Sequence, residues 1–142
     1  MEIAPIIARI AAKIPELRQV AAAGSVPLAV AAIKAYPAAC LLMPRGRADK
    51  NSLVNAVDHN VNDEFAVILA VRNVKDMYGL AAAADIDALR PDLIAALLNW
   101  VPAAGHDAVE YAGHQLLHYQ DGIMLWADHF ITRHHVRALT AQ

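Results

Sequence analysis

The chain has 142 residues, with 12 Lys and Arg against 14 Asp and Glu, and this length predicts one domain over residues 1–142. Apolar residues make up 58% of it, but alanine supplies 31 of them, so the positive mean hydropathy does not indicate a membrane protein. Charges and prolines interrupt every apolar run before the roughly 20 residues that cross a bilayer, and the formal charge of −2 gives no general attraction to nucleic acid.

The N-terminal third predicts a helix followed by short strands. Isoleucines recur at three- and four-residue steps over residues 3–14, which is the spacing of one helix face. Residues 17–23 favour a short strand, and residues 28–36 favour a short helical or irregular connection. The apolar run 38–43 lies between two prolines and is typical of a buried strand, so its Cys40 is expected to be a buried thiol.

The middle of the chain predicts an exposed arm and then the centre of a sheet. Residues 44–52 are polar and have no hydrophobic period, so they are expected to form an exposed loop or a flexible hairpin arm. Residues 53–61 alternate imperfectly, and Asn62 and Asp63 favour a turn after them. The run 65–71 is apolar on both faces, which favours a central strand.

Residues 80–100 predict a long helix, because their large apolar side chains keep to one helical stripe. Pro91 interrupts the stripe, so a kink or two abutting helices are expected there. The order of elements predicts an α+β fold, with a single mixed or antiparallel β-sheet and helices packed on one face.

The last third predicts a β-hairpin. Residues 109–119 and 123–133 flank Asp121 and Gly122, a dipeptide typical of two-residue hairpin turns. The tail from His134 onward is expected to fray. With a tight turn, the predicted register pairs Leu117 with Trp126, Gly113 with Phe130 and His114 with His129.

The residue types that carry catalysis give almost no signal. The sequence contains no glycine-rich phosphate motif, and its serines lack the context of a nucleophile. A pair of His114 and His129 falls short of the three protein ligands that a catalytic zinc ion usually has. The sequence therefore predicts no enzyme, catalytic residue, metal site or cofactor, and favours a domain that binds other proteins.

Two groups of polar residues are candidates for contacts with other subunits, because Arg is enriched at protein interfaces. Solvated surface charge is the alternative for both groups. The candidate contact loop comprises Arg45, Arg47, Asp49 and Lys50. The candidate hairpin surface comprises His114, His118, His129 and Arg133.

Four short motifs follow one another in the C-terminal half. They are Leu97-Leu98-Asn99-Trp100-Val101-Pro102 at the helix end, Tyr111-Ala112-Gly113-His114, Asp121-Gly122 and Trp126-Ala127-Asp128-His129-Phe130. In this order and spacing they resemble the tail terminator proteins of phages and prophages, a family similar to the lambda gpU minor tail protein. The resemblance spans most of the chain and is most specific over residues 93–131.

The resemblance implies a structural protein with an α/β sandwich fold. Such proteins form a ring, commonly a hexamer, which caps the tail tube, ends its polymerisation and prepares it for head joining. The implied partners are further copies of the chain, the tail tube protein and a head–tail connector protein. The implied location is the virion tail, assembled in the cytoplasm of the bacterial host.

Three other functions remain open at this point. One is a head–tail connector, or neck, protein of similar size and architecture. Another is a small metal-dependent enzyme that uses His114 and His129. The third is a small-molecule binding module with its cleft beside Trp126.

Overall fold

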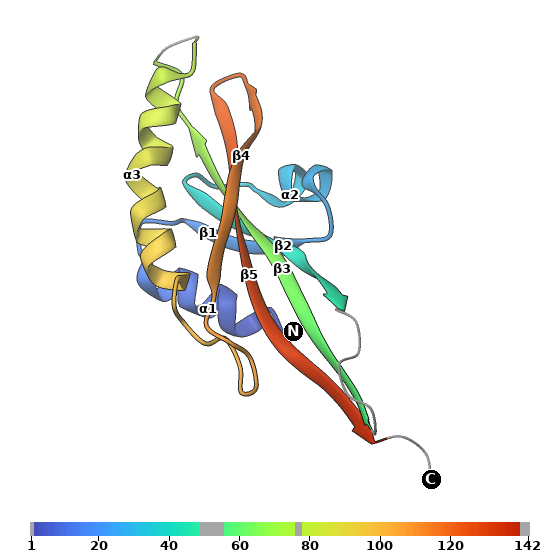
Figure 1. The fold of residues 1–142 in the computed structure, drawn as a ribbon. Helices are drawn as coiled ribbons and strands as arrows, with labels where there is room; N and C mark the ends of the chain where they lie inside the picture. The colour runs from blue at the N-terminus through green and yellow to red at the C-terminus, as the bar shows by residue number, and fades with distance from the viewer. Residues whose placement is uncertain (1, 49–55, 76–77, 140–142) are drawn as a thin grey trace.

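The computed structural model describes residues 2–48, 56–75 and 78–139, which form one five-stranded sheet and three helices (Figure 1). The elements are α1 (Ala4–Lys13), β1 (Gln19–Ala23), α2 (Val26–Ala32), β2 (Ala38–Ala48), β3 (Ala56–Arg72), α3 (Leu80–Leu97), β4 (Glu110–Gln120) and β5 (Ile123–Leu139). The strand order is β1-β2-β3-β5-β4, and β1 pairs with β2 in parallel while the other pairs are antiparallel. The predicted α+β class with one mixed sheet is confirmed.

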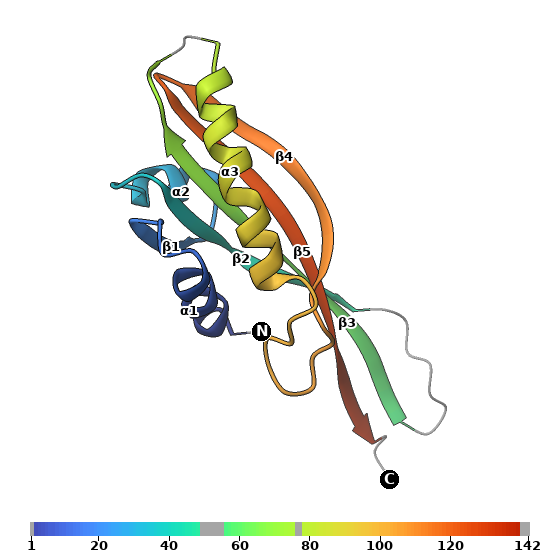
Figure 2. The ribbon, with the colours of Figure 1, turned by 90° about the vertical axis from the view of Figure 1, so that its left-hand side faces the viewer.

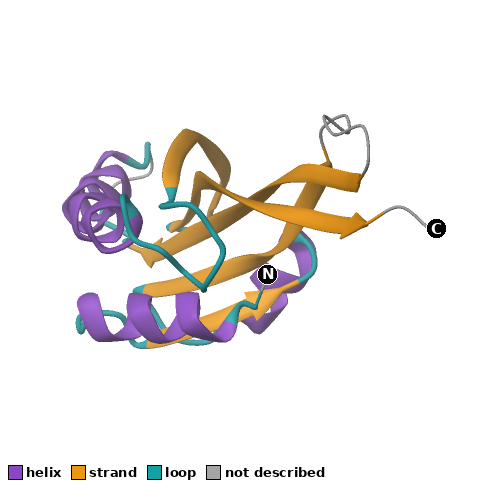
Figure 3. Ribbon diagram, turned by 60° about the horizontal axis from the view of Figure 1, so that its bottom comes forward, coloured by secondary structure: helices purple, strands orange, loops and turns teal. Residues whose placement is uncertain are grey.

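The two longer helices cover one face of the sheet, and α2 covers part of the other (Figures 2 and 3). The predicted stripe on α1 is confirmed, since Ile6 and Ile10 are fully buried against the sheet and α3. Helix α2 begins before the expected connection, because the Ser25 hydroxyl accepts a hydrogen bond from the N–H of Leu28 at its first turn. Because α2 packs on the opposite face of the sheet, the expectation of helices on one face holds for α1 and α3 but not for α2.

Strand β3 is the central strand, as its apolar run predicts. Its residues alternate between the two faces, so Val67 and Leu69 pack under α1 and α3 while Ile68 packs on the α2 side with the buried Cys40. The ring of Phe65 stacks on Phe130 of β5 with centroids 5.5 Å apart. Burial on both faces explains why this strand reads as a continuous apolar run.

Strands β3 and β5 pair over 17 residues each and extend beyond the helices (Figures 1 and 2). We call their outer paired segments, 56–64 of β3 and 131–139 of β5, the arm. The predicted turn at Asn62 and Asp63 is wrong, because both residues lie within β3 and pair with β2 and β5. The predicted fraying from His134 is also wrong up to Leu139, since this part of β5 pairs with β3. The polar residues of these segments lie where the two strands continue beyond the hydrophobic core, and they do not end either strand.

The loop expected over residues 44–52 is strand up to Ala48. The register of β2 shifts between Leu42 and Arg45, which places Pro44 at an irregularity where its missing N–H removes no regular ladder bond. Residues 49–55 lie outside the described part of the chain, and with them the rest of the expected loop.

The hairpin of β4 and β5 is confirmed, and Asp121 and Gly122 form its turn with φ of 54° and 78°. The predicted register holds only next to the turn, because β4 bulges at two places, between Leu116 and His118 and between Tyr111 and Gly113. The pairs predicted further along are therefore wrong. The observed pairs are Leu116 with Trp126, His114 with Asp128, Gly113 with His129 and Tyr111 with Phe130.

Helix α3 is one continuous helix with Pro91 inside it, so the expected division into two helices is wrong. Its buried face, which includes Ile86 and Leu93, packs on the sheet on both sides of the proline and holds the helix together. Arg9 of α1 donates a hydrogen bond to the Ala96 carbonyl in the last turn of α3. Within the described residues, no helix has the length and apolar character needed to cross a membrane.

Candidate functional site

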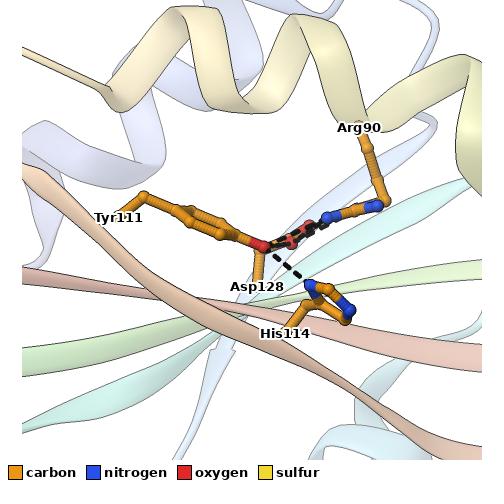
Figure 4. Close-up of polar contacts among 4 residues, drawn as sticks. All are labelled: Arg90, Tyr111, His114 and Asp128. Atoms are coloured by element: carbon orange, nitrogen blue, oxygen red, sulfur yellow. Dashed lines mark hydrogen bonds and ion pairs between the residues drawn. The ribbon is translucent and has the colours of Figure 1, made fainter.

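A buried carboxylate joins the hairpin to α3. The side chain of Asp128 on β5 has no exposed surface, and it accepts hydrogen bonds from Arg90 of α3 (Figure 4). Arg90 Nε lies 3.2 Å from each carboxylate oxygen, and its Nη2 lies 2.9 Å from Oδ1. The Tyr111 hydroxyl of β4 donates to the same oxygen at 2.8 Å. The buried charge is thus neutralised by a bidentate partner from the helix.

Two further side chains complete this Asp128 cluster, which we define as Arg90, Tyr111, His114, Trp126 and Asp128. His114 Nδ1 lies 3.2 Å from the Tyr111 hydroxyl (Figure 4). The His114 ring stacks on Trp126, with ring centroids 5.1 Å apart. The Arg90 guanidinium also lies over the Trp126 ring, 5.0 Å from its centroid. These side chains pack around the Trp126 ring, and the small-molecule module expected beside it stays a prediction.

The charges of the Asp128 cluster favour a structural role. The hydrogen bond to Asp128 raises the pKa of Arg90, and burial, with a further contribution from the hydrogen bond to Asp128, raises the pKa of Tyr111. Both groups therefore stay protonated near neutral pH, and neither is tuned for proton transfer there.

The β4 bulge between Leu116 and His118 divides the candidate hairpin surface between the two faces of the sheet. His114 lies opposite Asp128 on the face that α3 covers. His118 lies opposite Leu125, on the other face, and His129 also points to that face because it follows Asp128 along β5. The predicted pairing of His114 with His129 is therefore wrong, and the metal-dependent enzyme built on it loses its basis.

The structure brings part of the two candidate groups together on the face opposite α3. Arg45 of β2 and His129 of β5 line the same hollow of about 240 Å³, with Glu64 between them. His129 Nδ1 lies 3.6 Å from Glu64 Oε1. Arg47 lies opposite Asn62 in the register, while Asp49 and Lys50 are outside the described residues.

Arg133 lies further along the same face of β5. Its Nε donates to Asn62 Oδ1 at 2.9 Å, and its Nη1 donates to Glu110 Oε2 at 3.0 Å. We call this surface of alternating charge the arm face, and define it by Arg45, Asn62, Glu64, Glu110, His129 and Arg133. It joins members of both sequence-predicted groups.

A second cluster escaped the sequence analysis. Asp63 of β3, His106 of the α3–β4 loop and His134 of β5 each offer one ligand atom, and these atoms lie within 4.8 Å of one another. Burial lowers the pKa of His106, and the nearby His134 lowers it further. The three residues come from distant segments, so no sequence spacing could have indicated them.

The edge strand β4 offers another surface. Strand β4 ends the strand order, and most of its 11 side chains are exposed. Tyr111 and Leu116 are 37% and 49% exposed. The outer backbone of an edge strand can pair with a strand of another chain.

Comparison with known protein families identifies the family of this chain. The family model described as phage tail terminator protein matches residues 1–141. The chain belongs to the phage tail terminator family. The resemblance of the C-terminal motifs is confirmed, and this tail terminator protein is a structural component of a phage tail. No curated protein sequence matches it.

Proposed function

We propose that this tail terminator protein forms a homo-oligomeric ring, a hexamer as the family resemblance implies, that caps the tail tube and ends its polymerisation. The ring also prepares the tube for the head–tail connector protein. Residues 1–142 act as one domain in this ring, which assembles in the cytoplasm of the bacterial host. The match of the family model to residues 1–141 carries the proposal.

Two different surfaces of the subunit support a ring. A closed ring needs heterologous contacts, in which one surface of a subunit meets a different surface of the next. The outer edge of β4 and the arm face are two such surfaces, and they differ in character. The first offers backbone groups with Tyr111 and Leu116, and the second offers alternating charges around Arg45 and Glu64.

The described part of the candidate contact loop, Arg45 and Arg47, lies on β2 and pairs with β3. We propose that it contacts a neighbouring subunit or the tail tube protein through Arg45, Arg47, Asp49 and Lys50. Arg45 is exposed beside Glu64, so its charge is accessible to a partner.

Electron microscopy of tails made without this protein tests the proposal. Tubes of abnormal length are expected, because nothing stops their growth. Tubes of normal length that lack heads would contradict termination and favour a neck protein instead.

A triple replacement tests the contact loop. Changing Arg45, Arg47 and Lys50 to Ala should abolish ring formation or tube capping, measured by sedimentation of the full chain and by microscopy of tails. The matched control removes three positive charges elsewhere, at Lys13, Lys34 and Lys75, which are exposed. Unchanged rings and capping in the first variant would refute the contact.

A further inference from the structure

The cluster of Asp63, His106 and His134 holds unsatisfied polar atoms at the base of the arm. Four buried side-chain nitrogen or oxygen atoms of the described residues have no hydrogen-bond partner. Three of them are Asp63 Oδ2, His106 Nδ1 and His134 Nδ1. The side chains of Asp63 and His106 are only 7% and 10% exposed, so solvent does not compensate these atoms freely.

The distances within the cluster suit a bound metal ion. His134 Nδ1 lies 2.7 Å from Asp63 Oδ2 and His106 Nδ1 lies 3.9 Å from it, in both cases without hydrogen-bond geometry. Ligand atoms about 2.0–2.1 Å from a tetrahedral zinc ion are about 3.4 Å apart. The two observed distances lie on either side of this value, and all three ligand atoms lie within 4.8 Å of one another, so sub-ångström side-chain shifts would bring both pairs to the spacing of zinc ligands.

The backbone holds the three residues in place independently of their side chains. The loop beside His106 is fixed to β5, because Asp107 donates its N–H to the Arg133 carbonyl at 2.8 Å and its own carbonyl accepts from the Thr132 hydroxyl at 2.6 Å. On the other side of Asp63, Gly46 leaves room for the carboxylate, since a Cβ there would lie 2.9 Å from Asp63 Oδ1. Preorganised ligands of this kind favour binding.

We propose that Asp63, His106 and His134 bind a divalent first-row transition-metal ion such as Zn²⁺, which ties the α3–β4 loop to the arm. Two imidazoles and a carboxylate favour such an ion over Mg²⁺ or Ca²⁺, which prefer oxygen ligands. Three protein ligands leave a coordination position open, and the His134 side chain is 25% exposed, so water reaches the site. The proposal departs from the sequence-based expectation of no metal site and goes beyond tube capping.

Titration of the tag-free full chain with Zn²⁺, after treatment with a chelator, tests the site. Isothermal titration calorimetry should give one ion per chain, and His106→Ala and His134→Ala should each weaken the affinity at least tenfold. The matched control is His129→Ala, because His129 also lies near a carboxylate but, among the described residues, belongs to no such group of three ligands. It should bind Zn²⁺ as the original chain does.

A second measurement needs no variant and therefore does not depend on how well the variants fold. In nitrogen-15 spectra of the histidine rings, Zn²⁺ should shift the signals of His106 and His134 and leave His129 unchanged. Absence of Zn²⁺ binding would overturn the proposal and leave an ion pair between His134 and Asp63. Binding that survives both His106→Ala and His134→Ala would overturn it as well.

Discussion

Replacing Arg90 with Met should be the most destabilising change in the Asp128 cluster. The substitution keeps an unbranched side chain but removes the guanidinium group, and with it three hydrogen bonds, of 2.9 to 3.2 Å, to a carboxylate with no exposed surface. Leaving one charge of a buried pair without its partner costs about 3–5 kcal/mol. Tyr111 still donates to Asp128, so we expect a loss near the lower end, about 3 kcal/mol.

The converse change should cost less. Asp128→Leu also breaks the pair, but Arg90 is 21% exposed and can turn its charge toward water, so we expect a loss of about 1–2 kcal/mol. In the double variant neither charge is left buried. Its cost should therefore fall short of the sum of the single costs by at least about 1 kcal/mol.

Urea unfolding at neutral pH measures all three variants, provided that the transitions remain two-state. The order of stability should place Arg90→Met lowest among the single variants. A cost below about 1 kcal/mol for Arg90→Met, or strict additivity in the double variant, would refute the reasoning that Asp128 depends on Arg90 for its charge.

Three further predictions concern the core, the hairpin turn and the contact between α1 and α3. Burial raises the pKa of the Cys40 thiol, so the unfolded chain loses this proton first and the free energy of unfolding should fall as the pH rises above about 9. Urea unfolding across this range should show a smaller fall for Cys40→Ala, and an equal fall would contradict the assignment. Gly122 has φ of 78° and a Cβ there would lie 2.6 Å from a neighbouring side chain, so Gly122→Ala should cost at least about 1 kcal/mol in thermal unfolding, whereas Asp121→Asn should be tolerated. Arg9→Ala should cost about 1–2 kcal/mol in urea unfolding, because Arg9 hydrogen-bonds a carbonyl at the end of α3, and Lys13→Ala on the same helix is the control. Equal losses for Arg9→Ala and Lys13→Ala would speak against that contact.

The parts of the fold that the sequence predicts well are those with a local signal. The isoleucine period places α1, and the apolar run 65–71 places the centre of β3. Asp121 and Gly122 place the hairpin turn because the positive φ values of such a turn suit these two residue types. Each of these signals lies within a few residues of the structure that it predicts.

The parts that the sequence misses depend on distant partners. Asn62 and Asp63 read as a turn, but pairing with both β2 and β5 keeps them in a strand. The bulge between Leu116 and His118 moves His114 away from His129 and opposite Asp128, and no residue pattern in β4 predicts it. A bulge changes which face a side chain occupies, so the candidate hairpin surface could not be derived from the sequence alone.

We propose above that this tail terminator protein ends the growth of the tail tube. The most direct measurement polymerises purified tail tube protein with and without the purified full chain and follows tube length by electron microscopy. We expect that tubes stop lengthening once the chain is added and carry a ring of it at one end. Tubes that reach the same lengths in both samples, with no ring at either end, would contradict it.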